Sequence, residues 1–219
     1  MTGTELTAQE TKEQVLWAAQ EMLRSGLVEG TAGNVSARLP DGNAVLTPSS
    51  LDYEKMQLED LVVTDLDGKV LEGQRPPTSE KALHLTCLRQ HEDVGAVIHS
   101  HARFATMFAI THTPIPCVIE EFDVFVGGEV PVANYKLTGS DELAQEAARW
   151  LGDRGAVLMA NHGLLTVGKH PKDALKVAQL VERVAQIVWG AHLLGEVVPL
   201  PESTLKRFAP IYKMLRQRR

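Results

Sequence analysis

The segment Val94–His101, with the sequence VGAVIHSH, is the clearest local indication of the fold. An apolar run leads into two histidines separated by one residue, as expected for a buried β-strand followed by a polar end. Because side chains alternate between the faces of a strand, His99 and His101 are expected to project to the same side. A single histidine is most often a surface or hydrogen-bonded residue, but two on one face are well placed to bind one metal ion.

Two other segments favour the metal interpretation. Ala156–Gly163, with the sequence AVLMANHG, predicts an apolar strand followed by His162 and by a glycine that lets the backbone turn. Pro76–Glu80, with the sequence PPTSE, predicts a loop and then a helix that begins at a hydroxyl N-cap, with Glu80 in its first turn. Alone, Glu80 is explained by the favourable interaction of a carboxylate with a helix N-terminus.

Together, His99, His101, His162 and Glu80 form a candidate metal site. Three neutral imidazoles and one carboxylate suit a borderline divalent ion such as Zn²⁺, although the sequence does not distinguish Zn²⁺ from Mn²⁺ or Co²⁺. A carboxylate that can leave the ion and carry a proton would make the site catalytic rather than structural. Glu80 is therefore interpreted as both a metal ligand and the catalytic residue.

The motifs of the chain resemble those of the class II aldolase/adducin family. The matching stretches follow the family order: Gly33-Asn34, Thr47–Ser50, Thr78–Glu80, His99–His101 and Asn161–Gly163. They span most of the chain, and the set is specific although each piece alone is weak. The resemblance implies a single α/β domain over residues 1–219, with three layers and a central mixed, largely antiparallel sheet flanked by helices. It also implies a fourfold-symmetric homotetramer with active sites between subunits.

The resemblance further implies a zinc-dependent aldolase that cleaves a ketose 1-phosphate, such as L-fuculose 1-phosphate, to dihydroxyacetone phosphate and an aldehyde. Two related activities stay open, L-ribulose-5-phosphate 4-epimerase and methylthioribulose-1-phosphate dehydratase. The epimerases carry aspartate where Glu80 stands, which favours the aldolase. A non-enzymatic, adducin-like interaction domain is the last alternative, and the complete ligand set argues against it. The motifs do not identify the aldehyde.

The same resemblance assigns the substrate phosphate to three loops, through Gly33 and Asn34, Ser49 and Ser50, and Thr78 and Ser79. By itself, Gly33-Asn34 predicts only a turn. These loops contain no lysine or arginine. Phosphate binding would therefore depend on neutral donors and on the dipole of the following helix.

The chain departs from the family pattern in residues 117–126. Family aldolases carry there a tyrosine that donates a proton from a neighbouring subunit, and this segment has none. Either the proton comes from Glu121, Asp123 or a water, or the substrate is different. Glu121 and Asp123 are also candidate substrate contacts, although a solvated acidic edge explains them equally well. Tyr212 is the candidate for the C-terminal tyrosine that completes the site in the family. His84, one turn after Glu80, could support a metal ligand from behind, but an ordinary polar position is the expectation.

Composition limits the class of protein. Of 219 residues, 44% are hydrophobic and 23% charged, which is ordinary for one globular domain. A net charge of −6 argues against a nucleic-acid partner. Two cysteines without a disulfide framework, no basic-then-apolar leader and no apolar run of membrane-spanning length favour a cytoplasmic protein with no membrane partner.

The remaining elements follow from caps, turns and periodicity. A capping box at Thr7 predicts the first helix, and Asp67-Gly68 predicts a hairpin turn. The segment 104–109 is expected to pack Met107 and Phe108 into the core, and the basic end, within a flexible tail at about 203–219, is expected to be solvated. Further helices are expected at 140–150, 171–194 and 205–215, and further strands at 35–39, 44–47, 61–64, 69–72 and 164–167.

Overall fold

The structure is a computed structural model that describes residues 6–217. Within this range the eight strands form one sheet in the order β4-β3-β2-β1-β5-β8-β7-β6, and every pair is antiparallel except β6 with β7. This confirms the predicted mixed, largely antiparallel sheet. The elements are α1 Ala8–Arg24, β1 Asn34–Arg38, β2 Ala44–Leu46, η1 Leu58–Asp60, β3 Val62–Thr64, β4 Val70–Glu72, α2 Lys81–Gln90, β5 Ala96–Ser100, α3 Arg103–Ile110, α4 Glu120–Val126, β6 Val132–Ala133, α5 Asp141–Leu151, β7 Ala156–Met159, β8 Gly163–Gly168, α6 Pro171–His192 and α7 Glu202–Gln217.

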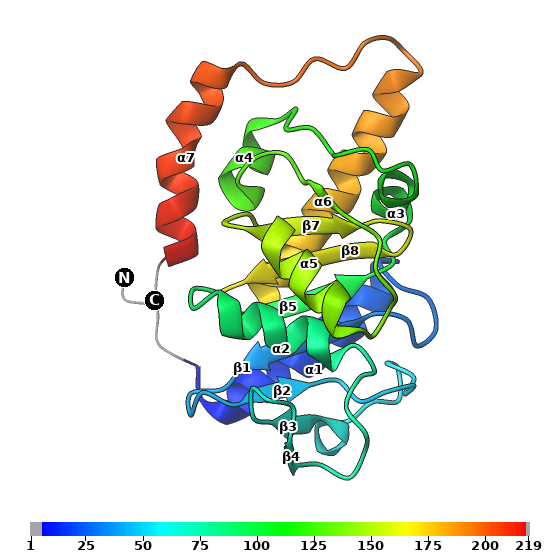
Figure 1. Ribbon diagram of the computed structural model, residues 1–219, viewed down its shortest axis with the longest axis vertical. Coiled ribbons are helices and arrows are strands. Elements are labelled where there is room, and N and C mark those ends of the chain that lie inside the picture. The colour runs from blue at the N-terminus through cyan, green and yellow to red at the C-terminus, as the bar shows by residue number, and fades with distance from the viewer. Residues whose placement is uncertain (1–5, 218–219) are drawn as a thin grey trace.

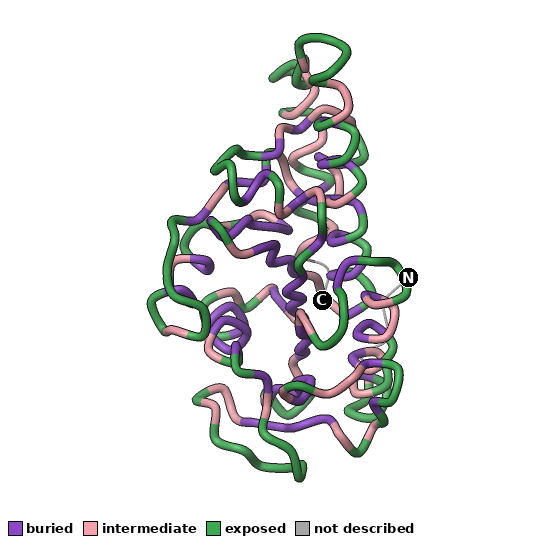
Figure 2. The backbone as a smooth tube through the Cα atoms, turned by 90° about the vertical axis from the view of Figure 1, so that its right-hand side faces the viewer, coloured by how far each residue is buried: buried purple, intermediate pink, exposed green. Residues whose placement is uncertain are grey.

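Helices cover both faces of the sheet, which gives the predicted three layers. The larger core lies between the sheet and α1, α3, α4 and α6. The smaller core lies on the opposite face, under α2 and α5, which Figure 1 shows side by side on the same side of the sheet. Most strands of the sheet are buried, whereas the edge strand β4 and the segment that joins α6 to α7 at the narrow end of the molecule are mostly exposed (Figure 2).

β5 lies near the middle of the sheet, between β1 and β8. Ala96 and Ile98 belong to the larger core, and Val97 belongs to the smaller one. A strand with helices on both faces has no solvated side, which explains why its sequence is a continuous apolar run. His99 follows Val97 by two residues, so it projects to the face that α2 covers.

Local signals set most helix starts correctly. At Thr7 both bonds of the capping box form, and Ser140 caps α5 through a bond from the Leu143 amide. The expected hydroxyl N-cap of α2 is wrong, because the N-cap is Glu80, and the Glu80 side chain makes no capping bond. That side chain is directed instead to the candidate site, which weakens the interpretation of Glu80 as a helix-end charge.

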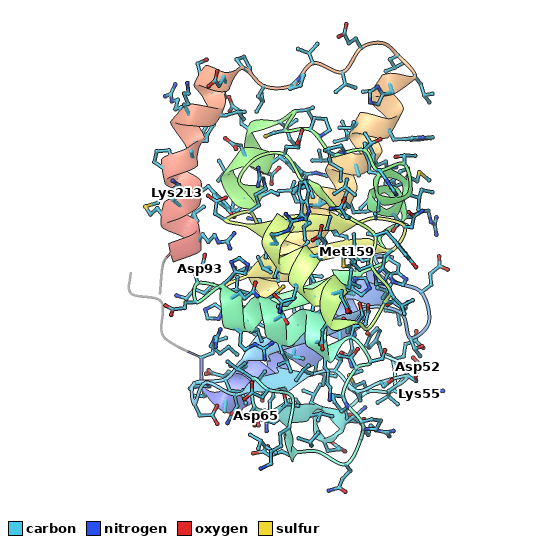
Figure 3. The ribbon with its side chains drawn as sticks, in the orientation of Figure 1. Asp52, Lys55, Asp65, Asp93, Met159 and Lys213 are labelled. Atoms are coloured by element: carbon cyan, nitrogen blue, oxygen red, sulfur yellow. The ribbon has the colours of Figure 1, made fainter. Side chains whose placement is uncertain are left out.

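Two expectations about burial are wrong. On α3, Phe108 is buried but Met107 is 36% exposed, because it lies on the solvent side of a helix that packs through Ala105, Phe108 and Ala109. The basic C-terminal segment is not solvated throughout, since the Arg216 side chain is only 11% exposed and pairs with Asp93, which lies beside the end of α7 (Figure 3).

The flexibility of residues 203–219 stays a prediction, and residues 218–219 lie outside the described range. Among the helices of residues 6–217, none combines the length and the apolar character that crossing a membrane requires.

Candidate active site

Glu80, His99, His101 and His162 converge at one end of the central strands. His99 and His101 come from the end of β5, His162 from the turn between β7 and β8, and Glu80 from the N-cap of α2. The Nε2 atoms of His99 and His101 are 3.0 Å apart. The Glu80 carboxylate lies 3.2 Å from His99 Nε2 through Oε2 and 3.4 Å from His162 Nε2 through Oε1. Tertiary structure thus brings together all four predicted ligands.

The β7–β8 hairpin brings His162 to the end of β5. β8 pairs antiparallel with β5, and Ser100 lies opposite Leu164. The turn is tight, with Asn161 in the left-handed region at φ 55° and the His162 amide bonded to the Met159 carbonyl. Gly163 permits the close approach, because a Cβ atom there would lie 2.6 Å from the Ser100 carbonyl oxygen and 3.1 Å from His101 Cδ2.

His99 and His162 have the protonation that metal ligands need. Burial lowers the pKa of His99 to about 3 and also lowers the pKa of His162, so both are neutral at pH 7. His99 Nδ1 lies 3.0 Å from the Leu164 carbonyl oxygen, which can only accept a hydrogen bond. The proton of His99 is therefore on Nδ1, and the Nε2 lone pair points toward the other site residues.

Glu80 is ionised at neutral pH. Burial by itself would raise the pKa of its carboxyl, but the neighbouring His99 and the hydrogen bond from Asn34 are among the interactions that bring the pKa to about 2. Its Oε2 accepts from Asn34 Nδ2 at 3.0 Å, and its Oε1 accepts from the Thr138 hydroxyl at 3.0 Å. Thr138 was missed in the sequence, because a threonine in an exposed loop carries no local signal of this contact.

This donor set fits a divalent metal ion. One nitrogen from each of the three histidines lies within 4.8 Å of the others, and a carboxylate completes the set. His162 turns its Nε2 toward Glu80, as a ligand nitrogen would, while its Nδ1 is buried without a hydrogen-bond partner among residues 6–217. Three neutral imidazoles and one carboxylate are ligands that Zn²⁺ accepts.

The expectation for His84 is wrong. It is completely buried on α2, where its Nδ1 lies 2.7 Å from the Ser36 hydroxyl and its Nε2 contacts Asn34 Oδ1. Burial lowers the pKa of His84 to about 4, so its ring is neutral. Its position one turn after Glu80 was visible in the sequence, but the side of the helix that the sheet covers was not.

The three predicted phosphate loops lie next to one another. Pro48 and Pro77 form an isolated antiparallel bridge, the Ser49 amide bonds the Pro76 carbonyl, and the Thr78 amide bonds the Thr47 carbonyl. Ser49 Oγ and Ser50 Oγ are 3.4 Å apart, and Ser79 is exposed. Gly33 precedes β1, with its carbonyl bonded at 2.5 Å by the buried hydroxyl of Tyr53.

Part of the predicted phosphate set is already engaged. The side chain of Asn34 bonds Glu80 and His84, and the Thr78 hydroxyl accepts from the Glu80 amide at 3.2 Å. The Ser49, Thr78 and Glu80 amides are engaged as well, so these loops can offer a ligand the serine hydroxyls and only those backbone N–H groups that the loops do not already use. Phosphate binding by these residues stays a prediction.

The three candidate proton donors lie on other elements. Glu121 pairs with Arg183, and Tyr212 donates to the Asp153 carbonyl at 2.7 Å. Asp123 is 4% exposed, and its Oδ2 is buried without a hydrogen-bond partner among the described residues. A solvated acidic edge therefore describes Glu121 but not Asp123. Within residues 6–217 of this one chain, none of the three bonds to Glu80 or to the site histidines.

Comparison with known proteins identifies the family. The model of the class II aldolase and adducin N-terminal domain matches residues 13–189. The chain belongs to the class II aldolase/adducin family. The match includes Gly33-Asn34, the Thr47–Ser50 loop and all four site residues, so the resemblance first drawn from the motifs is confirmed.

Individual members of the family align along nearly the whole chain. A 5-deoxy-D-ribulose 1-phosphate aldolase of Bacillus thuringiensis serovar kurstaki is 37% identical over 202 residues, which cover 92% of this chain and 94% of that protein. A 5-methylthioribulose-1-phosphate/5-deoxyribulose-1-phosphate aldolase of Rhodospirillum rubrum is 35% identical over 196 residues, covering 90% and 88%. A solved L-fuculose 1-phosphate aldolase superposes with a TM-score of 0.90 at 33% identity, covering 96% of this chain and all of that one. The fold is thus that of the class II aldolases.

Proposed function

We propose that this protein is a metal-dependent aldolase that cleaves a ketose 1-phosphate to dihydroxyacetone phosphate and an aldehyde. The observation that carries the proposal is the convergence of three imidazoles on an ionised carboxylate that is buried and held by two neutral donors. Such a carboxylate can act either as a ligand or as a base, which a purely structural metal site does not require.

His99, His101 and His162, together with Glu80, would hold Zn²⁺, with Mn²⁺ and Co²⁺ as alternatives. When bound, such an ion supplies Lewis-acid polarisation of the substrate carbonyl and of the adjacent hydroxyl. Glu80 would carry the proton that C3 of dihydroxyacetone phosphate gains when the C3–C4 bond has been cleaved, and that it loses in the reverse reaction. Its carboxylate is suited to this task because Asn34 and Thr138 orient both oxygens.

The substrate phosphate would bind at Gly33, Asn34, Ser49, Ser50, Thr78 and Ser79. The backbone contacts between the Thr47–Ser50 and Pro76–Ser79 loops support this assignment, because they place serine hydroxyls near the N-terminus of α2. A helix N-terminus attracts anions through its free amides and its dipole. The proton donor to the leaving aldehyde is left among Glu121, Asp123 and Tyr212, and these residues would reach a site only from a neighbouring subunit.

We infer a 5-deoxypentulose 1-phosphate or a 6-deoxyhexulose 1-phosphate as substrate. The support is that two relatives are named for 5-deoxyribulose 1-phosphate and the aligned structure for L-fuculose 1-phosphate. A cytoplasmic homotetramer with active sites between subunits is the assembly we propose with this activity. Epimerisation of L-ribulose 5-phosphate, dehydration of methylthioribulose 1-phosphate and a non-enzymatic interaction role are the alternatives that the experiment below distinguishes.

The test is release of dihydroxyacetone phosphate from 5-deoxy-D-ribulose 1-phosphate and L-fuculose 1-phosphate, followed through NADH oxidation by a coupled reductase. Zinc-loaded protein should release it, and the His99→Ala/His101→Ala double variant should not. His192→Ala, which alters an exposed histidine on α6, is the matched control and should retain full activity. Conversion of L-ribulose 5-phosphate or of methylthioribulose 1-phosphate without release of a three-carbon phosphate would contradict the proposal. So would zinc binding without turnover of any of these substrates.

A further inference from the structure

A buried polar chain connects β1 to the candidate site. On the face of β1 that α2 covers, Asn34 and Ser36 are two residues apart, and on α2 Glu80 and His84 are four apart. The strand period of two and the helix period of about four therefore bring the two pairs into contact. Ser36 and His84 are fully buried, Asn34 is 5% exposed and Glu80 is 8% exposed. Around them lie the apolar side chains of the smaller core.

The hydrogen bonds along this chain can run in only one direction. An ionised carboxylate only accepts, so the contact of 3.0 Å between Asn34 and Glu80 Oε2 requires the amide nitrogen to face Glu80. The amide oxygen of Asn34 then faces His84 Nε2, which must carry the proton. His84 Nδ1 is left with a lone pair, and it accepts from the Ser36 hydroxyl at 2.7 Å.

The other tautomer of His84 would reverse the chain. With the proton on Nδ1, the ring would donate to Ser36, and Nε2 would favour the amide nitrogen of Asn34. The Asn34 oxygen would then face Glu80 Oε2, and two acceptors would meet in a site without solvent. Thr138 cannot compensate, because its hydroxyl bonds Oε1 rather than Oε2.

We propose that His84 is a positioning residue for the active site: its Nε2–H fixes the Asn34 amide, and the amide fixes the Glu80 carboxylate. This inference rests on the proposed function, in which Glu80 is both a ligand and the proton carrier. The hydrogen bonds of the His84 ring go to Ser36 and Asn34 rather than to Glu80 or the site histidines, so the ring acts on Glu80 through Asn34. Groups that orient metal ligands in this way typically change metal affinity or activity by about 10–100-fold when they are removed.

The variants His84→Gln and His84→Asn test whether His84 positions Asn34 through a hydrogen bond or only fills volume in the core. The glutamine amide can reach the place of Nε2 and donate to Asn34, whereas the shorter asparagine reaches only the place of Nδ1. Zinc affinity is measured by competition with a chromophoric chelator, and folding is checked by urea unfolding. His84→Gln should bind zinc within a few-fold of the wild type, and His84→Asn about 10–100-fold more weakly. Equal affinity in the two folded variants would overturn the proposal.

A double-mutant cycle with Asn34→Ala provides the second measurement. If His84 acts through Asn34, adding His84→Asn to the Asn34→Ala variant should cause no further loss of zinc affinity. Losses that multiply in the double variant would show that His84 acts independently of Asn34 and would overturn the positioning role. The cycle remains informative if each variant is less stable. A loss of zinc affinity that came only from lower stability would also be seen when His84→Asn is added to the Asn34→Ala variant.

These measurements do not depend on turnover. If the protein releases no dihydroxyacetone phosphate but His84→Asn weakens zinc binding only when Asn34 is present, the positioning role is upheld and the aldolase function is rejected. If the wild-type protein is a fully active aldolase but His84→Gln and His84→Asn bind zinc equally well, the aldolase function is upheld and the positioning role is rejected. A wild-type protein that binds no zinc would overturn both.

Discussion

Replacing Gly163 by alanine tests how the β7–β8 hairpin positions the site. The φ angle of Gly163 lies outside the left-handed range, so alanine is compatible with its backbone, and only space decides the effect. The new Cβ would lie 2.6 Å from the Ser100 carbonyl oxygen, 3.1 Å from His101 Cδ2 and 3.3 Å from His99 Cε1. The first contact is with backbone, so β5 and β8 must move apart at the point where both strands position histidines.

The expected cost is that of overpacking a well-packed core, about 1–3 kcal/mol in the free energy of unfolding. For a chain of 219 residues this corresponds to a fall in Tm of about 2–12 °C, at about 2–4 °C per kcal/mol. Because His99 and His101 must shift with the strand, zinc affinity should fall as well, by about tenfold or more. A simple packing defect elsewhere in the core would lower the Tm without changing zinc affinity.

The assay pairs urea unfolding of the apo protein with zinc competition. The matched control is Gly190→Ala on α6, where a Cβ would meet nothing within 4 Å. That variant should be slightly more stable than the wild type, by up to about 1 kcal/mol, because alanine favours helix more than glycine does. If Gly163→Ala is as stable as the wild type and binds zinc as tightly, the steric argument is refuted. If the variant is less stable but its zinc affinity is unchanged, the link to the histidines is refuted.

Three further predictions concern pH, the metal and the C-terminal helix. Burial raises the pKa of Asp123, so its contribution to stability is present below the ordinary carboxyl pKa and is lost as pH rises through the raised value. Asp123→Asn should therefore melt higher than the wild type at pH 8 but not at pH 4, and an equal difference at both would contradict this. Zinc at 100 times its Kd should stabilise the apo protein by about 2.7 kcal/mol in thermal melts, with no such gain in the His99→Ala/His101→Ala variant. Tyr212→Phe removes the bond to the Asp153 carbonyl and should cost about 1 kcal/mol in urea unfolding; a more than tenfold fall in kcat without loss of stability would instead place Tyr212 at a neighbouring active site.

Local patterns were sufficient for most elements of the fold. The apolar run before His99 predicts a strand buried on both faces, and the capping residues Thr7 and Ser140 each begin a helix in the structure. These signals are reliable because strand periodicity, caps and turn residues depend on neighbours a few positions away. The expected burial of Met107 failed for a related reason: an apolar residue is compatible with either side of a short helix, and only packing decides which side is covered.

The sequence by itself determined the chemistry of the site: three histidines and a glutamate, on segments whose local structure was predictable, and motifs sufficient to indicate the family. Only tertiary structure decided which groups control that chemistry. Glu80 faces His99 because β1 lies between β2 and β5 and α2 crosses above it. The same packing buries His84 against Asn34 and brings Thr138 to the Glu80 carboxylate from 58 residues away. Contacts between residues so far apart in the chain depend on how layers stack, and no local periodicity or cap encodes them.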